Sequence, residues 1–317
     1  MLARYPLDSP RIIERLAASV RNDSYLIEGA DSRYVLRRYR RNPDGRRIRF
    51  QLAFQRELGR RGYPTSEIVP SSQGELFVAG PSGLWVLFTY VEGAEYDFAN
   101  MGQVAEAGRR LALFHNITRS IELEEVVLDI NPQLRRWWTH GDEELAALEE
   151  MFRNEGVEEE LAFLRTWHAG LVRDLPLERF DALPAGWVHA DFHGRNMVFA
   201  GEELRGLFDF DPLHRSVYVG DVAHALFMFG RESRGSTRIR PDAARTFLGN
   251  YERERKLADA EREALPAFGA LAWVPNPAYQ ALVRRDGEDT VAHFRRYVQL
   301  MRDLQSEMER LRAVLYP

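Results

Sequence analysis

The stretch that decides the fold is residues 189–196, which spell His-Ala-Asp-Phe-His-Gly-Arg-Asn. It places Asp191 two residues after His189, and Asn196 five residues after Asp191. Asp191 can accept the proton of an attacking hydroxyl group, and Asn196, on the far side of a tight loop, would turn its carbonyl oxygen toward a magnesium ion. A histidine two residues before an aspartate is common, so other residues must support this interpretation.

Asp209, which lies 18 residues after Asp191, supports this interpretation. It stands within residues 207–211, at the end of an apolar strand where a carboxylate has no packing purpose. The spacing of His189, Asp191 and Asn196 is that of the kinase catalytic loop, H-x-D-x-x-x-x-N, and Asp209 would bridge magnesium to the nucleotide phosphates as the later aspartate of kinases does. The combination predicts phosphoryl transfer, with Asp191 as the base and with Asn196 and Asp209 as ligands of Mg²⁺.

The residues before this loop predict a small β-rich part with one embedded helix. Ser9-Pro10 is typical of a helix start, so we expect a first helix over residues 10–20. The embedded helix has Phe50, Phe54 and Leu58 at a spacing of four and stops at Gly62. Strands are expected at residues 24–28, 34–39, 75–78 and 84–91, with a turn at residues 29–32.

Helical periodicity dominates from residue 104 onward. Helices are expected at residues 104–116, 132–152, 158–173, 220–229, 241–253 and 288–314. The exception is residues 186–210, with strands expected at 187–189, 196–199 and 204–210, the last two joined as a hairpin across residues 201–203. Because 317 residues exceed the usual size of a single core, we expect two lobes, residues 1–91 and residues 92–317.

The composition excludes several classes of function. The chain has no cysteine, which removes disulfides, thiolate metal sites and cysteine nucleophiles. Its histidines share no metal-ligand spacing, so a zinc site is not expected. No apolar run reaches the ~18 residues that span a bilayer, and no signal-peptide core follows Met1. We therefore expect a cytoplasmic protein without a membrane partner.

The net charge of −5 is unevenly distributed, with +6 on residues 1–50 and −11 on residues 51–317. Seven arginines lie within Arg37–Arg49, which allows the hypothesis of an RNA-associated surface whose affinity falls steeply with salt. A solvated strand edge and helix start is the favoured interpretation, so nucleic acid is not an expected partner. The acidic residues 142–160 are likewise interpreted as a solvated helical face.

Residues 188–196, followed by Phe208-Asp209-Phe210, resemble the signature motif of the aminoglycoside phosphotransferase and choline kinase superfamily. The resemblance covers most of the chain, and residues 22–41 and 204–229 are most similar to its homoserine-kinase-like branch. Within it, Asp221 corresponds to an aspartate that is structural. The resemblance implies a bilobal, protein-kinase-like α+β fold, with a small β-rich N-lobe for ATP or GTP and a larger helical lobe for a small-molecule acceptor.

The resemblance also implies a set of nucleotide-binding residues. Arg37 matches the family's third-strand lysine and Gln51 matches its glutamate partner, while Lys256 is the only lysine of the chain. Arginine can hold phosphate with two parallel hydrogen bonds and keeps its charge, so the change is chemically tolerable. The backbone near Thr89 and Val91 is expected to bind the base.

In the helical lobe, the resemblance implies that His193 braces the catalytic loop and contacts a phosphate; a packed, hydrogen-bonded imidazole is the alternative. The acceptor is expected between this loop and the helices that follow, where the candidate contacts are Asp142, Glu143, Asp211, His214 and Trp273. Asp211 is expected to touch either magnesium or a substrate amine. Amino alcohols, homoserine, aminoglycosides and peptide antibiotics all stay open as acceptors.

Two alternatives to a working kinase follow from the residues. One is a degenerate pseudokinase that binds nucleotide without transferring phosphate, because Arg37 and Gln51 depart from the family pattern. The other is the RNA-associated module. Against both stand Asp191, Asn196 and Asp209, which a protein without catalysis has no reason to keep together.

Overall fold

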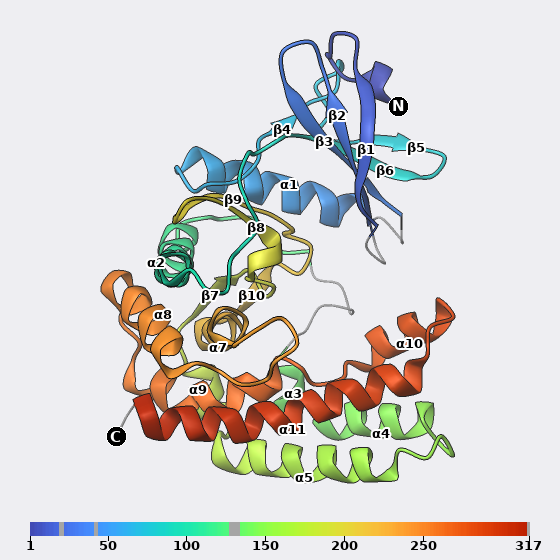
Figure 1. Ribbon diagram of the computed structural model, residues 1–317. Coiled ribbons are helices and arrows are strands. Elements are labelled where there is room, and N and C mark those ends of the chain that lie inside the picture. The colour runs from blue at the N-terminus through green and yellow to red at the C-terminus, as the bar shows by residue number, and fades with distance from the viewer. Residues whose placement is uncertain (19–21, 41–43, 127–133, 316–317) are drawn as a thin grey trace. The chain divides into compact units, whose positions relative to one another are not determined.

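The computed structural model describes residues 1–317 except residues 19–21, 41–43, 127–133 and 316–317 (Figure 1). The chain forms two compact units. Unit 1 contains residues 1–96, 120–126 and 194–211, and unit 2 contains residues 97–119, 127–193 and 212–317. The loop at residues 189–196 therefore begins in unit 2 and ends in unit 1.

Unit 1 is built on an antiparallel sheet with the strand order β1-β2-β3-β6-β4, and β5 pairs with β6. The strands are β1 (Arg11–Ala18), β2 (Asn22–Glu28), β3 (Arg33–Tyr39), β4 (Ile68–Val69), β5 (Val78–Gly80) and β6 (Gly83–Thr89), after a short 3₁₀ turn at Leu2–Arg4. The predicted turn at residues 29–32 is confirmed by a hydrogen bond from the Gly29 N–H to the Ser32 carbonyl, 2.9 Å long. The strand predicted at residues 75–78 is wrong except at Val78, where β5 begins.

Helix α1 (Gly45–Arg60) covers one face of this sheet, as Figure 1 shows. Its Ile48 and Leu52 pack with Tyr39 of β3 and Val86 of β6 in one buried cluster. The helix ends as the sequence predicts, before Gly62, whose φ of +80° favours glycine. Because side chains alternate along a strand, β3 turns Val35, Arg37 and Tyr39 toward the α1 face.

The helix predicted over residues 10–20 is wrong, because residues 11–18 form β1 and residues 19–20 lie outside the described part. The apolar side chains of this segment are not buried: Ile12, Ile13 and Leu16 are 56%, 46% and 41% exposed. A helix here would therefore have no apolar face packed against the rest of the protein. Pairing with β2 instead supplies the backbone hydrogen bonds, and Arg11 forms an ion pair with Glu28 across the two strands. The β-branched isoleucines favour this extended conformation.

The hairpin of β8 (Met197–Ala200) and β9 (Glu203–Leu207) completes unit 1. Gly201, at φ +61°, makes the turn that the sequence predicts between the two strands. Strand β9 ends at Leu207 rather than at the predicted residue 210, because Asp209 adopts a φ of +61° that no strand residue has.

Unit 2 is helical, apart from the two-stranded sheet of β7 (Ala185–Val188) and β10 (His214–Val217). Its helices are α2 (Met101–Thr118), α3 (Arg136–Thr139), α4 (Gly141–Met151), α5 (Glu158–Asp174), α6 (Leu177–Asp181), α7 (Tyr218–Gly230), α8 (Pro241–Glu254), α9 (Asp259–Leu271), α10 (Pro277–Arg285) and α11 (Thr290–Leu315). Every residue of α7 is buried, and this helix packs against α8 and α9 (Figure 1). Within the described residues, no helix combines the length and apolar character that crossing a membrane needs.

The single helix predicted over residues 132–152 is wrong. Residues 136–151 form α3 and α4, which break at His140, and residues 132–133 lie outside the described part. His140 leaves the helical conformation, with φ −143° and ψ 23°. Gly141 then approaches His168 so closely that a Cβ would lie 2.0 Å from the His168 Nε2. The sequence did not predict β10, α6, α9 and α10 of unit 2, nor β4 of unit 1.

Most of the described arginines within residues 37–49 form contacts inside unit 1. Arg38 and Arg40 form ion pairs with the buried carboxylate of Asp23. Arg47 is 2% exposed and donates to the carbonyl oxygens of Val126 and Asp211. Arginines engaged in this way offer few free charges to a phosphate backbone, which favours the structural interpretation over an RNA surface. Arg41 lies outside the described residues.

Candidate active site

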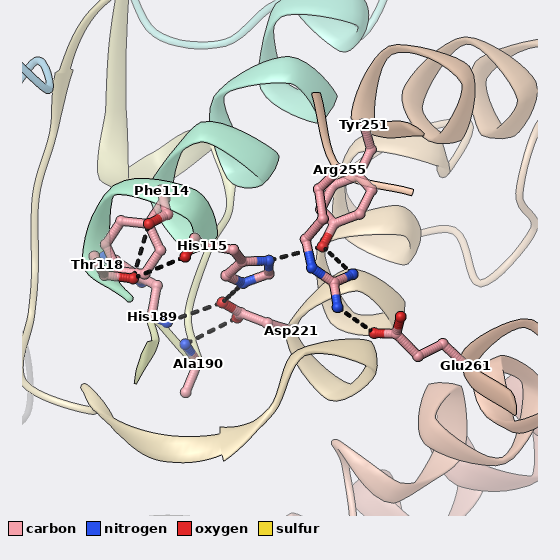
Figure 2. A network of polar contacts seen from close by, with 9 residues as sticks. All are labelled: Phe114, His115, Thr118, His189, Ala190, Asp221, Tyr251, Arg255 and Glu261. Carbon is pink, nitrogen blue, oxygen red and sulfur yellow. Dashed lines mark hydrogen bonds and ion pairs between the residues drawn. The ribbon is translucent and has the colours of Figure 1, made fainter. Parts of the chain in front are cut away.

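The loop that begins at His189 is held by Asp221 of α7. The Asp221 carboxylate accepts hydrogen bonds from the backbone N–H groups of His189 and Ala190, each 2.9 Å long (Figure 2). Ala190 has a φ of +62°, an unfavourable conformation for a residue with a Cβ. The two hydrogen bonds offset that strain, so Asp221 fixes the backbone immediately before Asp191.

A buried polar network extends from Asp221 through α2, α8 and α9, as Figure 2 shows. His115 Nε2 lies 3.2 Å from Asp221 Oδ2, and His115 Nδ1 lies 2.8 Å from the Tyr251 hydroxyl. Burial lowers the pKa of His115 although Asp221 opposes this, so the imidazole is neutral and Nε2 donates to the carboxylate. The Tyr251 hydroxyl donates to His115 Nδ1 and accepts from Arg255, whose other nitrogen pairs with Glu261 at 2.8 Å.

We expect Asp221→Asn to lower the free energy of unfolding by roughly 3 kcal/mol, since it replaces a buried carboxylate, which accepts from three donors, by a neutral amide that cannot accept from all of them. An amide at this position presents one oxygen to two backbone donors and points an NH₂ group at another donor. Chemical denaturation measures the change. Asp242→Asn, an exposed aspartate in the first turn of α8, is the matched control and should stay within about 0.5 kcal/mol of the wild type. Equal stability of the two variants would contradict the role given to Asp221.

The predicted base, Asp191, lies beside His193 within unit 2. The distance from His193 Nε2 to Asp191 Oδ1 is 3.1 Å, and the Asp191 side chain is 37% exposed. Burial would raise the pKa of Asp191, but the hydrogen bond and the charge of His193 lower it well below its usual range. The carboxylate is thus ionised at neutral pH. Burial also lowers the pKa of the nearby His224 to about 4 although Asp191 opposes this, so that imidazole is neutral.

A cavity of about 170 Å³ adjoins Asp191 in unit 2. Among the acceptor candidates, His214 and Trp273 line it, whereas Asp142 and Glu143 do not. The last two lie in the first turn of α4, where Asp142 is fully exposed. The sequence missed other lining residues, among them Leu134, His224 and Tyr297, because nothing local in the sequence marks the lining of a cavity.

The predicted metal ligands, Asn196 and Asp209, both belong to unit 1. Asn196 ends a 3₁₀ turn (Gly194–Asn196) that leads into β8, and Asp209 follows β9. The Asn196 carbonyl accepts a 2.8 Å hydrogen bond from the Phe208 N–H, which keeps the two segments adjacent. Gly194 is needed here because a Cβ would lie 2.4 Å from the Tyr96 side chain. No cluster of three or more His, Asp or Glu suited to a metal ion occurs among the described residues.

Arg37 of β3 points to the same end of unit 1. Its Nη2 donates to Asp209 Oδ1 at 2.9 Å and to Asp211 Oδ2 at 3.0 Å. Burial would lower the pKa of Arg37, but the two carboxylates raise it well above its ordinary value, so the guanidinium stays charged. Gln51 of α1 does not bond to Arg37 and instead donates to the Asp211 carbonyl at 3.0 Å. The partners of Arg37 are therefore the two carboxylates.

A cavity of about 310 Å³ in unit 1 brings together most of the residues that the sequence assigned to the nucleotide. Its lining includes Arg37, Gln51, Thr89, Val91 and Asp209, together with Val35, Tyr90, Asp211 and other residues. Leu16 of β1 also lines it. The sequence could not assign Leu16 to this cavity, because its segment was predicted to be a helix.

Comparisons with known proteins identify the family of this chain. The model of a family described as the phosphotransferase enzyme family matches residues 12–264. A homoserine kinase of Sinorhizobium medicae strain WSM419 is 26% identical over 297 residues, which cover 90% of this chain and 86% of that protein.

Two solved structures have the same fold. A microcompartment-associated aminopropanol kinase matches with a TM-score of 0.71 at 18% identity, over 100% of this chain and 97% of its own. An amicoumacin kinase in complex with AMP-PNP and Ca²⁺ matches with a TM-score of 0.68 at 18% identity, over 95% and 91% of the two chains. The predicted α+β kinase-like fold is thereby confirmed. Because the family match spans most of the chain, including residues 189–196 and 207–211, this protein belongs to the phosphotransferase enzyme family and is a small-molecule kinase.

Proposed function

We propose that this protein transfers the γ-phosphoryl group of ATP to a hydroxyl group of a small molecule. The observation that carries the proposal is Asp191, an aspartate kept ionised by His193 and placed at a cavity large enough for a small acceptor. The acceptor proton passes to the Asp191 carboxylate as the acceptor oxygen bonds to phosphorus, and the bond from phosphorus to the ADP oxygen breaks. His193 orients the carboxylate.

The donor is assigned to the cavity of unit 1. Val35, Thr89 and Val91 would enclose the base, and Arg37 would hold the phosphates. The complex of the similar amicoumacin kinase with AMP-PNP supports an adenine nucleotide over GTP.

Asn196 and Asp209 would hold Mg²⁺ together with the nucleotide phosphates. An amide oxygen and a carboxylate suit this ion, which usually takes few protein ligands and completes its shell with phosphate oxygens and water. When bound, Mg²⁺ neutralises charge that develops on the phosphates.

The size of the acceptor cavity favours small acceptors. Its volume of about 170 Å³ is close to the ~150 Å³ of an engineered cavity that takes benzene, a molecule of six non-hydrogen atoms. An amino alcohol or homoserine has a comparable size, whereas an aminoglycoside has several rings. Metabolic acceptors are therefore proposed ahead of antibiotics.

A screen of nucleotide consumption tests the proposed function. The purified protein is incubated with ATP, Mg²⁺ and, one at a time, amino alcohols, homoserine and other hydroxyl amino acids, and aminoglycosides. ADP should form only when Mg²⁺ and a small acceptor are both present, and excess EDTA should abolish its formation. Nucleotide binding without turnover of any acceptor would contradict the proposal and favour the pseudokinase alternative.

A further inference from the structure

The positive group expected at the nucleotide phosphates has an unusual counter-ion in this chain. In kinases the strand-three lysine pairs with a glutamate of the following helix. Here α1 offers the neutral Gln51, whose amide NH₂ donates to the Asp211 carbonyl and whose side chain forms no hydrogen bond with Arg37. The carboxylates that meet Arg37 come instead from the segment after β9, more than 170 positions along the chain.

Asp211 is held in this position from several elements of unit 1. Its Oδ2 accepts a 2.7 Å hydrogen bond from Asn22 Nδ2 of β2 in addition to the 3.0 Å bond from Arg37. Its carbonyl oxygen accepts from Gln51 Nε2 and from Arg47 Nη2, at 3.0 and 2.7 Å. The Asp211 side chain is 19% exposed. A carboxylate fixed by this many donors is not placed to reach out toward a substrate amine.

The two carboxylates that contact Arg37 have different proposed roles toward a metal ion. Asp209 is the proposed ligand of Mg²⁺, so its contact with Arg37 through Oδ1 would weaken if that oxygen were to bind the metal. Arg37 is only 15% exposed, and a charge that is buried to this extent needs a counter-ion. Asp211 remains available to serve as that counter-ion while Asp209 is engaged.

We propose that Asp211 is a positioning residue that replaces the helix glutamate as the counter-ion of Arg37, and so holds the guanidinium in place for the nucleotide phosphates. The inference rests on the proposed function, in which Arg37 grips those phosphates. Arginine suits this arrangement because its planar fork of five donors can bond a carboxylate and a phosphate together, which a compact ammonium group does less well.

The test uses Asp211→Asn, which keeps the shape of the side chain and an oxygen for Asn22. Calorimetry measures the affinity for ADP in the presence of Mg²⁺ and again in EDTA. We expect the affinity to fall by about 10- to 100-fold in both conditions, as for a lost charged hydrogen bond. A loss seen only with Mg²⁺ would overturn the proposal, because Asp211 would then act on the metal.

A second variant moves the carboxylate back to the helix. Gln51→Glu combined with Asp211→Asn should recover at least part of the lost affinity for ADP, whereas a residue that only stabilises the fold would not be rescued in this way. Glu202→Gln, at the exposed tip of the β8–β9 hairpin, is the matched control and should bind ADP like the wild type. Failure of the double variant to bind better than Asp211→Asn, with both variants folded, would contradict the inference.

Steady-state kinetics separates this inference from the proposed function. If Asp211 positions Arg37, the KM for ATP rises in Asp211→Asn while the KM for the acceptor stays unchanged. A rise in the acceptor KM alone would assign Asp211 to the substrate and overturn the inference. If the wild type neither binds ADP nor turns over any acceptor, the proposed function fails instead.

Discussion

Replacing Asp191 with alanine is expected to lower kcat by about 10²–10⁴-fold, the range typical of a positioned acid–base group. The variant loses the group that takes the acceptor proton, while its nucleotide-binding residues, which lie in unit 1, are unchanged. It should fold normally, because the Asp191 side chain is partly exposed and the loop backbone is held by Asp221. A coupled assay of ADP release measures the loss, and thermal melting verifies the fold.

Asp174→Ala is the control for this prediction, since Asp174 is an exposed acid of the same unit at the end of α5. It should keep wild-type turnover. Wild-type turnover in Asp191→Ala would show that Asp191 is not the base.

The pH dependence of kcat/KM tests the role of Asp191 independently. A base is active when ionised, and the pKa of Asp191 is held well below its usual range. Activity that depends on this base is therefore retained down to pH values below an ordinary aspartate pKa of about 3.9. We expect no loss of kcat/KM from this group between about pH 5 and pH 9. An acidic limb near pH 6–7 that disappears in Asp191→Asn would contradict the lowered pKa.

Replacing Arg37 with alanine is the second large effect expected. It removes the proposed grip on the nucleotide phosphates and leaves Asp209 and Asp211 without the cation that they share. Nucleotide affinity and turnover should fall together, each by roughly 10- to 100-fold, because a phosphate grip acts in both the ground state and the transition state. Arg37→Lys should also be harmful, since an ammonium group does not reproduce the planar fork. The KM for ATP and kcat measure both variants.

Arg38→Ala is a matched control on the same strand. Arg38 points to the opposite face of β3, where it bonds to Asp23. Its loss should leave the KM for ATP unchanged. If Arg37→Ala retains wild-type affinity and turnover while Arg38→Ala does not, the strand assignment is off by one residue.

The elements that the sequence predicted correctly are those in which the local pattern and the packing agree. Helix α1 follows from Phe50, Phe54 and Leu58 at a spacing of four, and all three are buried. The β8–β9 hairpin follows from two short apolar runs on either side of Gly201. The first strand failed because Ile12, Ile13 and Leu16 have a spacing compatible with a helix, while the structure leaves them exposed on an edge strand. Pairing with β2 decided the conformation there.

By itself, the sequence determined the kind of chemistry this protein is built for. Asp191, Asn196 and Asp209 are separated by short chain segments, so their spacing in the sequence is enough to predict phosphoryl transfer. Only the tertiary structure decided which partners set the charges of the site. The carboxylates that pair with Arg37 are those of Asp209 and Asp211, and the group that holds the loop before Asp191 is Asp221, itself bonded to His115. These partners lie from about 30 to more than 170 positions apart along the chain, where local periodicity gives no signal, and they meet because packing buries the polar groups and each must then find a partner.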